Sequence, residues 1–94
     1  MAMFKSKELK QVEKDLKKRV DDLLYLTKQG KVHQETLPLQ YRAMAQLANK
    51  IESLGGDASR IVLGERGIAK AWFPSVGDQL IEQMLSNIRQ FQQP

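Results

Sequence analysis

The chain of 94 residues has no cysteine and a single histidine, His33. Without cysteine it can form no disulfide, no thiolate nucleophile and no cysteine-based metal site. One histidine is too few for a zinc site or a histidine-based triad. We interpret His33, which lies in a connector, as a surface residue rather than a catalytic or switch residue. We therefore predict no metal and no other cofactor, and a reducing, cytoplasmic location.

Long apolar runs and prolines are also scarce. No stretch approaches the ~20 apolar residues of a membrane span, and the N-terminus lacks the apolar core of a signal peptide. With 41% hydrophobic and 28% charged residues and three prolines, the composition is typical of a globular protein. We predict one helical domain over residues 1–94. Met1-Ala2-Met3 is either a cloning remnant ahead of a start at Met3 or native sequence, and is left out of the fold prediction.

The most regular pattern runs from Lys5 to Gln29. An advance of ~100° per residue gathers its apolar residues into one sector about 120° wide. The sector contains Leu9, Val12, Leu16, Val20, Leu23, Leu24 and Thr27. This predicts an amphipathic helix that ends near Gly30 and buries that face.

The charges of this helix are sorted by sign. One flank carries the residues that we call the lysine wall: Lys7, Lys10, Lys14, Lys17 and Lys18. Asp21 is the one acid on that flank, whereas Glu8, Asp15 and Asp22 lie on the opposite flank with Arg19. Residues 5–19 hold seven basic and three acidic residues, and this difference equals the whole net charge of +4. The lysine wall is either a solvated, solubilising face or a contact strip for something acidic.

Two further helices are predicted with similar regularity. After a connector over residues 30–35, Thr36 is a suitable N-cap for a helix that runs to Leu54 with apolar residues at 3/4 spacing. At the other end, Ser75 and Asp78 have the spacing of a capping box that opens a helix to about Gln92. The short connector favours an antiparallel hairpin of the first two helices.

The segment between them is broken by glycines. Asp57 is a capping residue, and Gly64 and Gly67 weaken a continuous helix. We predict two short pieces, residues 58–63 and 66–72, that end before Pro74. The complete prediction is an all-α fold, an antiparallel bundle of three to four helices.

The predicted lengths do not match. The first helix would be roughly 37 Å long and the second roughly 25 Å, at 1.5 Å per residue. A hairpin would then leave Leu9 beyond the second helix. The residues 61–72 segment, the C-terminal helix or a second copy of the chain would have to cover it. A homodimer is therefore one expectation.

Two residues outside the first helix are further candidates for partner binding. Trp72, in the only aromatic cluster, either packs at a hinge or anchors a partner. Arg66 would present its charge from a glycine-flanked turn. Tyr25 lies off its helix's apolar stripe and should be exposed, whereas Tyr41 lies on its stripe and should be buried.

These patterns favour a small, non-enzymatic interaction or regulatory protein that docks an acidic macromolecule, a protein in the first instance. The docking residues would be Lys7, Lys10, Lys14, Lys17, Lys18, Arg66 and Trp72. An alternative is a nucleic-acid-associated regulator that contacts phosphates through the same face, although no aromatic is interleaved and no helix-turn-helix spacing appears. In size and shape alone the chain also resembles bacteriocin immunity proteins. No set of residues forms a catalytic constellation, so we do not expect an enzyme.

Overall fold

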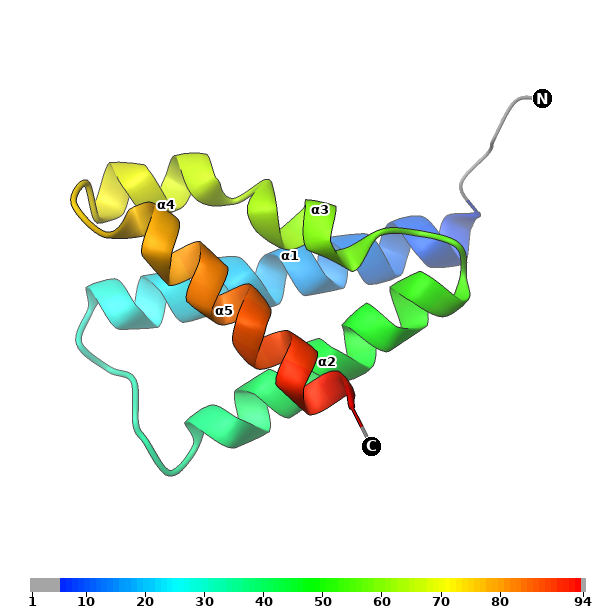
Figure 1. The fold of residues 1–94 in the computed structure, drawn as a ribbon, viewed down its shortest axis with the longest axis horizontal. Helices are drawn as coiled ribbons and strands as arrows, with labels where there is room; N and C mark the ends of the chain where they lie inside the picture. Colours follow the sequence, from blue (N-terminus) through cyan, green and yellow to red (C-terminus); the bar gives the residue numbers. More distant parts are fainter. Residues whose placement is uncertain (1–5, 94) are drawn as a thin grey trace.

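The computed structural model describes residues 6–93, which form five helices and no strand (Figure 1). The helices are α1 (Lys7–Lys28), α2 (Leu37–Ser53), α3 (Ala58–Leu63), α4 (Arg66–Trp72) and α5 (Gly77–Gln92). α1 and α2 form a hairpin, α3 and α4 follow one another as a broken third helix, and α5 crosses from the end of α4 to α2. The all-α bundle is confirmed. Met1-Ala2-Met3 and the expected start of the first helix at Lys5 lie outside the described residues.

Most helix ends follow the sequence signals. Ser6 caps α1 by accepting a hydrogen bond from the Leu9 amide at 3.0 Å, and Gly30 ends it with a left-handed φ of 67°. Asp57 caps α3 through the amides of Ser59 and Arg60. Local sequence therefore determines both the start and the end of α1.

Of two predicted caps, Thr36 takes its predicted position without a capping hydrogen bond, and the capping box of Ser75 is wrong. Thr36 occupies the N-cap position of α2, but its backbone is helical and its hydroxyl donates to the His33 carbonyl oxygen at 3.1 Å. The expected capping box of Ser75 does not form, because α5 begins one residue later with Val76 as N-cap and without a side-chain cap. The turn there is closed instead by the amide of Gly77, which donates to the Phe73 carbonyl oxygen at 2.7 Å.

The core lies between α1, α2 and α5, with α3 and α4 closing one side. The apolar stripe of α1 is buried as predicted, apart from Thr27, which is half-buried. The main core residues facing it are Tyr41, Met44, Ala45, Ala48 and Ile51 of α2 and Ile81, Met84 and Ile88 of α5. Each fully buried aliphatic side chain contributes about 1.5–3 kcal/mol.

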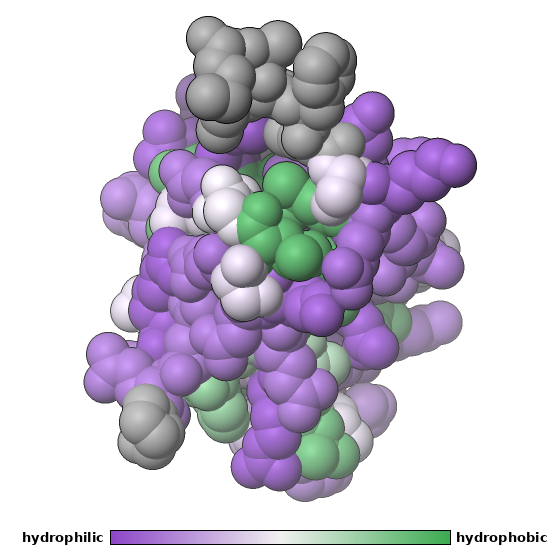
Figure 2. Space-filling view, turned by 90° about the vertical axis from the view of Figure 1, so that its right-hand side faces the viewer, coloured by the Kyte–Doolittle hydropathy of each residue, from purple (hydrophilic) through white to green (hydrophobic). Residues whose placement is uncertain are grey.

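Leu9 is covered within the same chain. It is buried, and Gly56, in the connection between α2 and α3, lies directly against its side chain. α2 reaches the beginning of α1, where Lys50 pairs with Glu8 at 3.1 Å. Figure 2 views this end of the molecule and shows a largely hydrophilic surface with a hydrophobic patch above its centre and smaller hydrophobic areas toward its lower edge. The length mismatch therefore no longer supports a second copy, and the homodimer stays a prediction.

The far end of α1 is joined to α4 through aromatic rings. Tyr25 and Trp72 form an edge-to-face pair with ring centroids 6.2 Å apart, and Lys28 donates to the Trp72 carbonyl oxygen at 3.3 Å. Tyr25 is exposed and Tyr41 is buried, as predicted. Trp72 is half-buried against the core. Its exposure is thus intermediate between that of a packed hinge residue and that of an exposed anchor for a partner. Within residues 6–93, no helix has the length and apolarity to cross a membrane.

Candidate functional site: a basic pocket between α1 and α3

The fold divides the lysine wall into separate environments. Lys10, Lys14 and Lys17 border a hollow between α1 and α3. Lys18 borders a different hollow, between α1 and α2. Lys7 is exposed and borders neither hollow. The lysine wall, which is continuous on a helical wheel, is therefore divided between two hollows and one exposed position once the other helices are in place.

The hollow between α1 and α3, which we call the basic pocket, has a volume of about 420 Å³. It is lined by Lys10, Glu13, Lys14 and Lys17 of α1, Arg60 and Ile61 of α3, and Gly64 and Glu65 of the α3–α4 junction. Ile61 and Gly64 supply uncharged surface, and four cations surround it. Two of these residues, Glu13 and Glu65, are buried acids. The pocket thus combines an uncharged surface and two buried acids with a mainly cationic rim.

Three of the cations are available to a ligand. Within residues 6–93, no ion pair involves the side chains of Lys10, Lys14 or Arg60, and all three residues are exposed. They come from two helices and converge on one hollow, so an acidic group placed there would meet several positive charges at once.

The fourth cation, Lys17, is already engaged. Its ammonium nitrogen lies 3.2 Å from a carboxylate oxygen of Asp21 and 3.6 Å from one of Glu65. The hydrogen bond to Asp21, followed by the charge of Glu65, raises the pKa of Lys17. Lys17 therefore connects α1 to the α3–α4 junction.

Glu65 is the most unusual ionisable residue of the site. It is only 4% exposed, and its neighbours include the carboxyl group of Asp21. Burial, followed by the hydrogen bond and the negative charge of Asp21, raises the pKa of Glu65 to about 7, although Lys17 opposes the shift. Near neutral pH this carboxyl group is therefore divided between its protonated and ionised forms.

The other two predicted partner-binding residues lie away from the basic pocket. Arg66 is directed toward α5, where its guanidinium nitrogen lies 3.9 Å from an Asp78 carboxylate oxygen. Trp72 lies at the opposite end of α4, against Tyr25. Neither residue lines the pocket. The structure does not join the predicted docking residues into one surface.

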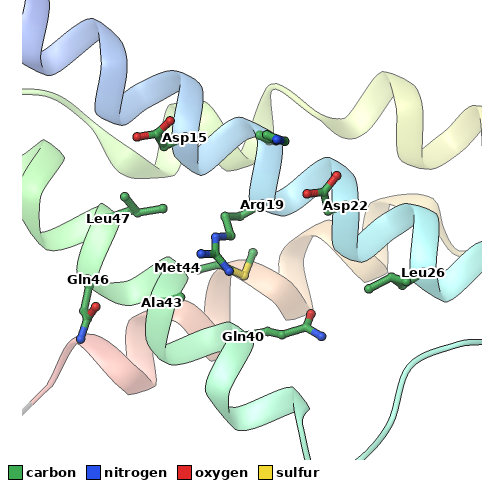
Figure 3. A pocket seen from close by; sticks show the side chains of 10 residues that line it. Asp15, Arg19, Asp22, Leu26, Gln40, Ala43, Met44, Gln46 and Leu47 are labelled. Carbon is green, nitrogen blue, oxygen red and sulfur yellow. The ribbon is translucent and has the colours of Figure 1, made fainter.

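A second hollow, the α1–α2 groove, has a volume of about 690 Å³. Its lining residues are Asp15, Lys18, Arg19, Asp22, Leu26, Gln40, Ala43, Met44, Gln46 and Leu47. Figure 3 shows Arg19 extending from α1 toward Met44 and Gln40, with Asp15 and Asp22 on either side of it. Its two acids and two bases balance, so the groove has no preference for an acidic ligand.

The basic pocket contains residues that sequence reasoning did not select. Arg60 and Ile61 lie in the predicted short helix over residues 58–63, and Glu65 lies between the two predicted pieces, where no pattern marks it as part of a site. One signal was available, because Asp21 is a lone acid in a row of lysines and such a residue suggests a local partner. No group of three or more His, Cys, Asp or Glu residues that could hold a metal ion occurs in the described part of the chain.

Comparison with known proteins adds no further constraint. No protein-family model, curated protein or solved structure matches this chain significantly. The functional argument therefore depends on the geometry and charge of the pocket.

Proposed function

We propose that this protein is a non-enzymatic interaction protein that docks an acidic segment of a partner protein in the basic pocket. The observation that carries the proposal is the convergence of Lys10, Lys14 and Arg60 on a hollow whose uncharged surface comes from Ile61 and Gly64. A complementary ligand has one apolar side chain for the hollow and acidic residues beside it for the rim. We propose a cytoplasmic location on the absence of cysteine.

The expected binding energies favour a ligand that uses both the cationic rim and the uncharged surface of the basic pocket. An exposed ion pair contributes about 0.2–1 kcal/mol, so three such pairs alone give weak binding. Burying one apolar side chain adds about 2 kcal/mol and gives the complex a defined register. The charges would mainly accelerate association, which makes binding sensitive to salt.

A nucleic-acid partner is the alternative that uses the same cations. The pocket suits it less well, because a phosphate backbone would leave the uncharged surface of Ile61 and Gly64 unused, and none of the residues that line the pocket is an aromatic on which a base could stack. Nothing beyond size and shape favours the immunity-protein alternative, and shape does not establish function.

The test uses a synthetic peptide with one leucine flanked by aspartates and glutamates, titrated into isotopically labelled protein. We expect amide shifts to concentrate at Arg60, Ile61 and Gly64 and at the adjoining turns of α1. Replacing the leucine of the peptide by serine should weaken binding by roughly thirtyfold, since about 2 kcal/mol of burial is at stake.

Charge reversal separates the pocket from general attraction. The double variant Lys10→Glu/Lys14→Glu should lose peptide binding. The control Lys31→Glu/Arg42→Glu changes the net charge equally at two exposed residues outside both hollows and should retain it. Equal losses of peptide binding in both variants would show that the attraction is nonspecific and does not depend on the basic pocket. Salt-dependent binding to random duplex DNA, without peptide binding, would favour the nucleic-acid alternative.

A further inference from the structure

Two carboxyl groups face each other beside the basic pocket. Oδ1 of Asp21 and Oε2 of Glu65 are both buried, and neither has a hydrogen-bond partner when both groups are ionised. Buried polar atoms without partners are costly, and two adjoining carboxylates repel each other. One proton on Glu65 removes both problems, because its O–H can then donate to an Asp21 oxygen. The pair is therefore a site for one proton.

Lys17 links this proton site to the pocket. Its ammonium lies between Asp21 and Glu65 and also forms part of the pocket rim. With both acids ionised, Lys17 is held by two negative charges inside the chain. With Glu65 protonated, only Asp21 competes for it, and a ligand carboxylate can take the second position.

The surrounding charges have opposite effects on Glu65, because cations favour its ionised form and acids favour its protonated form. From α1, Lys17 and Asp21 interact with Glu65. Glu13, Lys10 and Lys14 of α1 and Arg60 of α3 line the same hollow, whereas Arg66 of α4 is turned toward Asp78 of α5. An arriving acidic group adds negative charge beside Glu65, which favours its protonated form.

We propose that docking of an acidic ligand in the basic pocket is coupled to the uptake of one proton from solvent by the Asp21–Glu65 pair, which releases Lys17 to the ligand. This inference rests on the proposed function. An O–H bond forms on Glu65 as the corresponding bond to hydrogen in water or buffer is broken, and no other covalent bond changes. The coupling is reciprocal, so ligand promotes protonation and protonation promotes binding.

The proposal fixes the direction of the pH dependence. Below the pKa of Glu65 in the free protein the proton is already present, and affinity does not change with pH. Above it, each bound ligand must bring a proton, and the dissociation constant rises by up to tenfold per pH unit. We expect the affinity for the acidic peptide to fall by about tenfold between pH 6 and pH 8.

The principal test is isothermal titration calorimetry of the acidic peptide at pH 7.5 in phosphate and in Tris. These buffers differ in ionisation enthalpy, so the difference in measured heat counts the protons taken up. We expect uptake of a substantial fraction of one proton. Glu65→Gln, which imitates the protonated acid, should abolish the uptake and bind at pH 8 as the wild type binds at pH 6. Glu82→Gln, at an exposed position of α5, should leave the uptake unchanged.

A second measurement needs no ligand. The side-chain carboxyl carbon of Glu65 is followed by nuclear magnetic resonance as pH changes, in the wild type and in Lys17→Met. We expect titration near neutral pH, moving higher when the lysine is removed. An ordinary Glu65 titration overturns the coupling. Peptide binding without proton uptake also overturns it but leaves the docking function intact, whereas absence of peptide binding overturns both.

Discussion

Gly77, the first residue of α5, lies directly against the backbone of Ala69 in α4. A methyl group at Gly77 would stand 2.6 Å from the carbonyl carbon and oxygen of Ala69. Backbone atoms cannot move aside as a flexible side chain can. Only glycine therefore allows α5 to begin where it does, and this contact determines how the last two helices meet.

Gly77→Ala should destabilise the protein by about 1–3 kcal/mol, because the two helices must separate to admit the methyl group. The matched control is Gly67→Ala within α4, where nothing lies within 4 Å of an added methyl group. That change should stabilise by up to ~1 kcal/mol through helix propensity. Urea unfolding measures both. Equal effects of the two substitutions would contradict the close approach of α4 and α5.

The stability of the protein should fall as pH rises toward neutrality because of Glu65. Its pKa is about 7 in the folded protein against an ordinary value of 4.5. Between these values the folded state holds a proton that the unfolded state does not, so the free energy of unfolding falls with rising pH and then levels off. The contribution is roughly 1–3 kcal/mol.

Glu65→Gln isolates this contribution. The variant should be more stable than the wild type at pH 8, and the difference should shrink toward pH 5. Thermal unfolding at both pH values, with Glu82→Gln as the exposed control, measures it. A wild type that is relatively more stable at pH 8 would show that Glu65 is held in its ionised form.

The single tryptophan reports the joint between α1 and α4. Tyr25→Ala removes the ring that packs edge-to-face on Trp72, so tryptophan emission should move to longer wavelength. The free energy of unfolding should fall by about 0.5–1.5 kcal/mol. Leu39→Ala, at a residue 60% exposed in α2, is the control and should change neither quantity. Unchanged emission in the Tyr25 variant would mean that the two rings do not touch in solution.

Arg89, which is half-buried, should contribute more to the free energy of unfolding than an exposed cation does. Its guanidinium donates to Glu52 of α2 at 2.7 Å and to Ser59 of α3, so it joins three helices. Arg89→Met keeps most of the aliphatic stem and should cost about 1 kcal/mol, allowing for screening by solvent. Arg42→Met on the exposed face of α2 should have little effect. Urea denaturation of both variants checks this difference.

Local sequence patterns were sufficient to predict the helices. The 3/4 spacing of apolar residues identified α1, α2 and α5, and the left-handed Gly30 and the capping Asp57 marked boundaries that the structure retains. These features depend on interactions a few residues apart, which a single sequence contains. The capping box at Ser75 failed because the turn after Pro74 is determined by the packing of Gly77 on α4.

The candidate site was less predictable because it depends on which flank of α1 each neighbouring helix covers. A helical wheel places Lys17 and Lys18 side by side, but α3 lies against one and α2 against the other. Nothing near Glu65 in the sequence indicates that it is buried or lies beside Asp21. Tertiary placement alone creates this pair of acids.

α1 presents a different surface on each side. Its apolar stripe faces the core, one flank borders the basic pocket, and the other flank borders the α1–α2 groove. Deleting one residue between Leu16 and Val20 would rotate the rest of the helix by about 100°, so that its side chains would face different surroundings. The helix should therefore accept only insertions or deletions that are close to a whole number of turns, such as seven or eleven residues, because these keep each side chain on its original face. This segment should therefore tolerate point substitutions better than changes in its length.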